Sequence, residues 1–117
     1  MARYEATVHG TIDELKEYIN RTKPNLGITI SVEEETTGEV DGIKYYIAGL
    51  ERYAALGQNR VSLNISLLEY SEGVRVIATS LGGSQAAFFK INHWSEDNFL
   101  NDFVRVLESY EREITNR

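Results

Sequence analysis

The chain has 117 residues, a length typical of one domain, and a formal net charge of −6. It contains no cysteine and only 2 histidines, which excludes disulfide bonds, thiolate nucleophiles and a multi-histidine zinc site within one copy. Lysine and arginine are scattered along the sequence, so the acidic balance argues against nucleic acid as a partner.

Two absences bear on where the protein resides. No apolar run approaches the roughly 20 residues that a membrane-spanning helix needs. The first ten residues, MARYEATVHG, lack the basic-then-apolar pattern of a signal peptide. We therefore predict no membrane insertion and a cytoplasmic location.

Residues 2–8 alternate between apolar and polar side chains, which predicts a half-buried strand that ends at Gly10. Thr11 and Glu14 follow with the spacing of a capping box, in which each side chain satisfies a free backbone donor at a helix start. Pro24 limits this first helix to about three turns, because the residue before a proline avoids helical angles.

Residues 28–81 are typical of an antiparallel meander of four strands, separated by turns that contain glycine. Alternation is clearest in residues 61–67, where every second residue is apolar. In the second strand Ile43, Tyr45 and Ile47 share one face, but the apolar positions switch parity from Leu50 onward. A bulge of one residue at Gly49 would explain that switch.

With a bulge at Gly49, Tyr46 lies on the outer face of the sheet, opposite Ile43 and Ile47. An exposed aromatic there favours a dimer or a partner surface, and a cross-strand pair is the alternative interpretation. Tyr46 is therefore the candidate interface residue.

The run Glu33-Glu34-Glu35 suggests a metal site at first sight. On a regular strand, however, Glu33 and Glu35 share one face and Glu34 takes the other. A solvated strand end explains the run better, and we predict neither a metal nor a cofactor.

Residues 82–94 interrupt the strand pattern and hold the strongest candidate for a ligand site. Adjacent glycines let a backbone approach a ligand closely, and irregular connections on a rigid sheet often carry function. The alternative is a connector whose aromatic side chains close the end of the core. The Gly-Gly-Ser sequence lacks the spacing of a phosphate-binding loop. The candidate ligand-binding residues are Gly82, Gly83, Ser84, Phe88, Phe89, His93 and Trp94.

Neither histidine has a nucleophile or carboxylate partner that the sequence reveals. His93 stands just before the last helix, and His9 ends the first strand. We expect local hydrogen bonding rather than acid–base catalysis from His93, and His9 is the weaker candidate for catalysis, so the sequence points away from an enzyme.

The segment from Ser95 to Ile114 predicts a long amphipathic helix, with Ser95 as its N-cap. Its apolar residues fall within roughly 120° of one another at the helical period, and a stripe that wide is expected to cover a sheet. The stripe consists of Phe99, Leu100, Phe103, Val106, Leu107, Tyr110 and Ile114.

The order strand, helix, four strands, helix resembles the helix-grip and TBP-like group of folds, in which a curved antiparallel sheet wraps a long C-terminal helix. The resemblance covers the whole chain and rests on topology. The chain also looks like a small uncharacterised bacterial family, which implies no activity. Helix-grip proteins that hold lipids or hormones are usually longer, and TBP-like DNA binders are strongly basic. The short, acidic chain departs from both.

We therefore expect one α+β domain over residues 1–117, with a curved antiparallel sheet of roughly five strands packed on the last helix. The favoured function is a non-catalytic module that binds a small apolar or amphipathic ligand between the sheet and that helix. The alternative is a ligand-free domain that interacts with a protein partner or forms a homodimer.

Overall fold

The computed structural model describes residues 2–26, 30–53, 60–82 and 99–116. Its elements follow the predicted order of strand, helix, four strands, helix, with one short 3-10 helix added after the first helix. They are β1 (Ala2–Val8), α1 (Ile12–Thr22), η1 (Lys23–Leu26), β2 (Ser31–Val40), β3 (Ile43–Tyr53), β4 (Arg60–Tyr70), β5 (Gly73–Gly82) and α3 (Phe99–Thr115).

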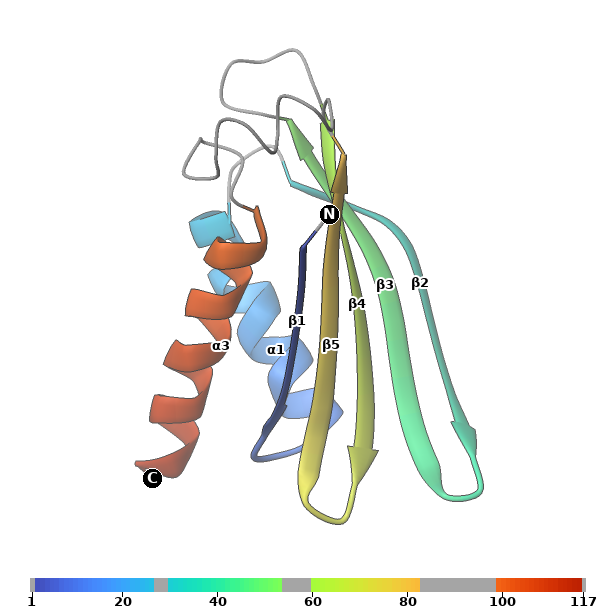
Figure 1. The fold of residues 1–117 in the computed structure, drawn as a ribbon. Helices are drawn as coiled ribbons and strands as arrows, with labels where there is room; N and C mark the ends of the chain where they lie inside the picture. The colour runs from blue at the N-terminus through green and yellow to red at the C-terminus, as the bar shows by residue number, and fades with distance from the viewer. Residues whose placement is uncertain (1, 27–29, 54–59, 83–98, 117) are drawn as a thin grey trace.

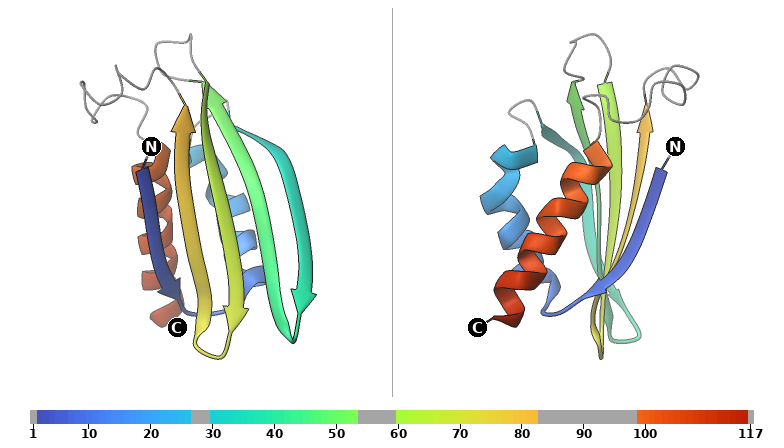
Figure 2. Two further views of the ribbon diagram at one scale, coloured as in Figure 1. Left: turned by 45° about the vertical axis from the view of Figure 1, so that its right-hand side comes forward. Right: turned by 60° about the vertical axis from the view of Figure 1, so that its left-hand side comes forward.

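The strands form one open antiparallel sheet of 5 strands in the order β1-β5-β4-β3-β2 (Figure 1). The first strand therefore pairs with the last, with Ala2 opposite Ser80 and Val8 opposite Val74. Both α-helices lie on the same face of this sheet, and no described element covers the other face (Figure 2). The predicted α+β class is confirmed.

The C-terminal helix packs its predicted stripe against the sheet. Phe99, Phe103, Leu107 and Tyr110 are each exposed by 2% or less. Across from them, alternate residues of β4 and β5 are buried, as the alternation in the sequence predicts. This contact between helix and sheet makes up much of the hydrophobic core, while the predicted N-cap Ser95 lies outside the described residues.

The start of α1 shows the predicted capping box. The Glu14 amide donates to Thr11 Oγ1 at 3.2 Å, and the Thr11 amide donates to Glu14 Oε1 at 3.0 Å. The helix ends at Thr22 and gives way to η1, which contains Pro24.

The predicted bulge at Gly49 is wrong. The pairing of β3 with β4 runs without a break from Lys44 to Tyr53, so one parity holds along the whole of β3. Tyr46 and Leu50 face the helices and are buried, whereas Ile43 and Ile47 lie on the outer face and are 37% and 39% exposed. The prediction of Tyr46 as an exposed outer-face residue is therefore corrected.

The irregularity lies in the neighbouring strand β2, between Val32 and Glu34. It interrupts the alternation that was expected to place Glu33 and Glu35 on one face. Glu33 instead lies 3.8 Å from the guanidinium of Arg60, while Glu35 accepts a hydrogen bond from Tyr46 on the helix-facing side.

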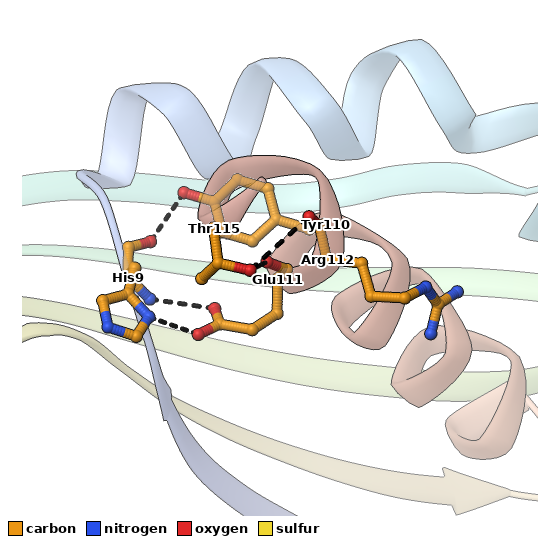
Figure 3. Close-up of polar contacts among 5 residues, drawn as sticks. All are labelled: His9, Tyr110, Glu111, Arg112 and Thr115. Atoms are coloured by element: carbon orange, nitrogen blue, oxygen red, sulfur yellow. Dashed lines mark hydrogen bonds and ion pairs between the residues drawn. The ribbon is translucent and has the colours of Figure 1, made fainter. Parts of the chain in front are cut away.

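His9 joins the end of β1 to the last turns of α3 (Figure 3). Its backbone amide donates to Glu111 Oε1 at 3.0 Å, and its ring Nδ1 contacts the other oxygen of that carboxylate. The hydroxyl of Tyr110 donates to the His9 carbonyl at 2.7 Å. These bonds attach the junction between β1 and α1 to the C-terminal helix.

Candidate functional site

Most of the predicted ligand-binding segment lies outside the described residues. Gly82 is the last residue of β5. The other six predicted residues, Gly83, Ser84, Phe88, Phe89, His93 and Trp94, fall in the range 83–98, which the structure does not describe. Their role in ligand binding stays a prediction.

The described part of the interface between α3 and the sheet is filled by side chains of the core. Three hollows lined by described residues lie beside α1 instead. This helix packs over β3 and β4 and leaves the helix-facing side of β2 uncovered (Figure 2). All but one of the ten residues of β2 are exposed, the exception being half-buried Gly38.

A hollow of about 460 Å³ runs between α1 and this uncovered part of the sheet. Its volume falls within the range of small-molecule sites. We call it the α1 groove, and its lining residues are Asp13, Lys16, Glu17, Ile19, Asn20, Lys23, Val32, Glu35, Tyr46, Leu50 and Ile65.

The floor of the α1 groove is apolar. Leu50 and Ile65 come from adjacent strands and are 4% and 2% exposed, so they belong to the core as well as to the groove. Val32 is 40% exposed at the rim, and half-buried Ile19 completes the apolar surface from the helix side. A ligand that covers this floor would gain free energy from burial of apolar area.

A polar group stands at one end of that floor. Tyr46 is 7% exposed, and its hydroxyl donates to Glu35 Oε1 at 2.7 Å. The ammonium of Lys16 lies 4.4 Å from the centre of the Tyr46 ring, a cation–π contact across the groove. Burial, and then the hydrogen bond to Glu35, raise the pKa of Tyr46 well above its usual range, so the phenol stays protonated and donates.

A second hollow, also of about 460 Å³, continues along α1 toward the hairpin between β2 and β3. It shares Asp13 and Lys16 with the α1 groove and adds the charged residues Glu39, Lys44 and Glu69. The Glu69 carboxylate accepts a hydrogen bond from the backbone amide of Ile12 at 2.9 Å. This bond fixes the start of α1 over β4. Charges of both signs thus line this end of the hollow.

The arrangement provides an apolar floor beside groups that donate and accept hydrogen bonds. Lys16 and Lys23 supply ammonium donors, and Glu35 supplies a carboxylate acceptor. Within the part of the chain that the structure describes, no three side chains of histidine, cysteine, aspartate or glutamate lie close enough to hold a metal ion. The groove therefore has the features of a binding site for an amphipathic small molecule.

Sequence reasoning missed the residues of this groove. Lys16 and Asn20 lie one turn apart on α1, and Tyr46 was assigned to the wrong face. Tyr46, Ala48 and Leu50 are alternate residues of β3, so without a bulge they share one face. Buried Leu50 would then have placed Tyr46 on the helix-facing side. The pairing of Tyr46 with Glu35 depends on the register between β2 and β3, which no local pattern reveals.

These features define a small α+β protein in which two helices cover one face of an open five-stranded antiparallel sheet. The model of DUF6054, described as a family of unknown function, matches residues 1–111, and the chain belongs to that family. No curated protein matches the sequence. Among the described residues, no helix combines the length and apolar character that crossing a membrane requires.

Proposed function

We propose that this protein is a binding module that holds a small amphipathic ligand in the α1 groove. The observation that carries the proposal is the apolar floor of Leu50 and Ile65, with Val32 at its rim. This surface lies beside the hydrogen-bonded pair of Tyr46 and Glu35. Six of the eleven lining residues are charged or polar, so the groove suits a ligand that combines an apolar part with polar groups.

The groove suggests how such a ligand is oriented. Its apolar body would lie over the floor, where burial supplies affinity. Its polar head would lie near Lys16, a donor over the face of the Tyr46 ring, and near Glu35, the acceptor bound to the Tyr46 hydroxyl. A head group that both accepts and donates hydrogen bonds fits this pair best.

The site predicted between the sheet and the C-terminal helix remains part of the proposal as a second location. Phe88, Phe89 and Trp94 would supply its apolar surface, and Ser84, Gln85 or His93 would orient the ligand. The likeness to helix-grip folds and the cytoplasmic location are likewise proposals that rest on the sequence. A Trp94→Ala variant that loses ligand binding at unchanged stability would favour this second location over the groove.

Two matched tryptophan substitutions on β2 test the groove. Val32 lies at the groove rim, while Val40 lies on the outer face of the same strand and is 62% exposed. We expect Val32→Trp to fill the groove and to weaken binding of the neutral dye Nile red by at least about tenfold, with Val40→Trp unchanged. Equal dye binding by the wild type and both variants would contradict the proposal.

A second function, self-association through the outer sheet face, is supported by a separate observation. Val40, Ile43, Ile47, Tyr70 and Leu81 are large apolar side chains between 37% and 62% exposed. Val40 pairs with Ile43, and Ile47 lies on the same face of β3, so these three form an exposed apolar surface of the kind that interacts with partners. The interface residue then shifts from Tyr46, which is buried, to Ile43 and Ile47.

Analytical ultracentrifugation distinguishes the two functions. A concentration-dependent dimer that dissociates in the Ile47→Lys variant, with no dye taken up by the wild type, would favour self-association. A monomer at every concentration that binds dye would favour the ligand-binding module.

A further inference from the structure

A third hollow, of about 310 Å³, lies between α1 and α3. We call it the helix seam. It shares no lining residue with the α1 groove, so it presents a separate chemical surface. Its lining residues are Tyr18, Thr22, Asp102, Arg105, Val106, Ser109 and Arg112.

The helical repeat brings these side chains together. Asp102, Arg105, Ser109 and Arg112 recur at intervals of three or four residues, so they line one face of α3. On α1, Tyr18 and Thr22 stand one turn apart and face them. The sequence analysis placed no function on this face.

Tyr18 of α1 contacts α3 through both its ring and its hydroxyl, and so fixes the two helices against each other at the seam. Its ring packs edge-on against Tyr110, with centroids 5.4 Å apart. Its hydroxyl donates to Ser109 Oγ at 2.7 Å. Because Ser109 accepts this bond, its own hydroxyl hydrogen is available to donate to a molecule in the hollow.

The seam carries more positive than negative charge, although the whole chain has a net charge of −6. Asp102 is the carboxylate of the lining, and both of its oxygens are engaged: one accepts from Arg105 at 3.0 Å and the other from Arg52 at 2.9 Å. Arg112 forms no ion pair with any residue in the described ranges. Figure 3 shows its guanidinium extending along the helix, away from the carboxylate of Glu111.

We propose that the helix seam binds a phosphoryl group. Arg105, Ser109 and Arg112 offer donors from three positions within about two turns of one helix, and a tetrahedral oxyanion has oxygens to accept from all three. Guanidinium groups match phosphate oxygens in charge and in geometry. The phosphoryl group belongs either to a soluble small molecule or to a lipid headgroup.

The test follows the backbone amide signals of Tyr18, Thr22, Ser109 and Arg112 by NMR while inorganic phosphate is added, with chloride holding the ionic strength constant. A parallel arm measures co-sedimentation with vesicles of phosphatidylcholine that contain phosphatidic acid. Saturable shifts of these amide signals would show that the seam binds a soluble phosphate compound. Co-sedimentation that depends on Arg112, without such shifts, assigns a lipid headgroup.

Two variants of equal net charge separate a site from general electrostatics. Arg112→Gln removes a donor from the seam, and Arg3→Gln removes one from the outer sheet face, where Arg3 pairs with Glu5. We expect Arg112→Gln to weaken binding at least about tenfold and Arg3→Gln to leave it within about twofold. Absence of binding in both arms, or equal weakening by the two variants, would overturn the proposal. Neither outcome depends on the α1 groove.

Discussion

Arg52 shows how a buried charge is accommodated. Its side chain is 8% exposed, and its guanidinium lies 4.4 Å from the centre of the Phe99 ring. It also donates to the carbonyl of Leu26 at the end of η1 and to Asp102 in α3. A single residue of β3 therefore connects η1 with the first turn of the C-terminal helix.

Removing that charge is expected to destabilise the protein. Arg52→Met should lower the free energy of unfolding by about 3 kcal/mol, because the Leu26 carbonyl and one oxygen of Asp102 lose their partner. The measurement is urea unfolding followed by circular dichroism. Arg105→Met removes the other partner of Asp102 at a side chain that is 73% exposed, and it should cost less than about 1 kcal/mol. Equal losses in the two variants would contradict this account.

Glu5 on the outer sheet face gives a pH-dependent prediction. Hydrogen bonds from Arg3 and then Arg75 hold the pKa of Glu5 below its ordinary value of 4.5. A pKa lowered by folding stabilises the folded state above pH 4.5, and that contribution is lost as the pH falls through the lowered pKa. The stability of the wild type should therefore fall more steeply with acid than that of Glu5→Gln.

An NMR titration of the Glu5 carboxyl checks the cause. Arg3→Gln should move its pKa upward by more than Arg75→Gln does, because the bond from Arg3 contributes most. A Glu5 pKa that neither variant changes would show that the two arginines are not responsible.

At the scale of elements, the turn between β1 and α1 depends on Gly10. This residue has φ of +96°, and a side chain there would collide with the hydroxyl of Tyr110, which bonds to His9. Gly10→Ala should lower the free energy of unfolding by about 2 kcal/mol, through backbone strain and loss of that hydrogen bond. Thermal unfolding measures the loss.

Gly49 provides the matched control within a strand. A Cβ at Gly49 meets no atom within 4 Å, and its φ is not positive. Gly49→Ala should therefore be neutral or stabilise the protein slightly, because alanine restricts the unfolded chain. A larger loss at Gly49 than at Gly10 would refute this account of the turn.

The elements that the sequence predicted well are those fixed by local patterns. Thr11 and Glu14 determine the start of α1 through bonds between near neighbours, and the stripe of α3 follows from its own period. The prediction of which face of β3 is buried was wrong, because Ile43 and Ile47 look like core residues when that strand is considered alone. The opposite parity is buried because Ala48 and Leu50 continue one unbroken ladder with β4.

At the scale of the molecule, the α1 groove follows from the placement of the two helices over the sheet. The helix α3 covers β1, β5 and β4, and α1 lies over β4 and β3, so neither helix extends over β2 (Figure 2). Sequence patterns could predict both layers, but not which strand would stay uncovered.

The residues whose NMR signals respond to a ligand show whether it binds in the α1 groove or on another surface of the protein. The measurement is a ¹³C-methyl NMR spectrum of the isoleucine, leucine and valine residues, recorded while the neutral amphiphile octyl glucoside is added below its micelle concentration. We predict saturable shifts at the methyl groups of Ile19, Val32, Leu50 and Ile65, with Val40 and Ile43 unchanged. Shifts confined to the outer sheet face or to α3, or no shift at all, would contradict ligand binding in the α1 groove.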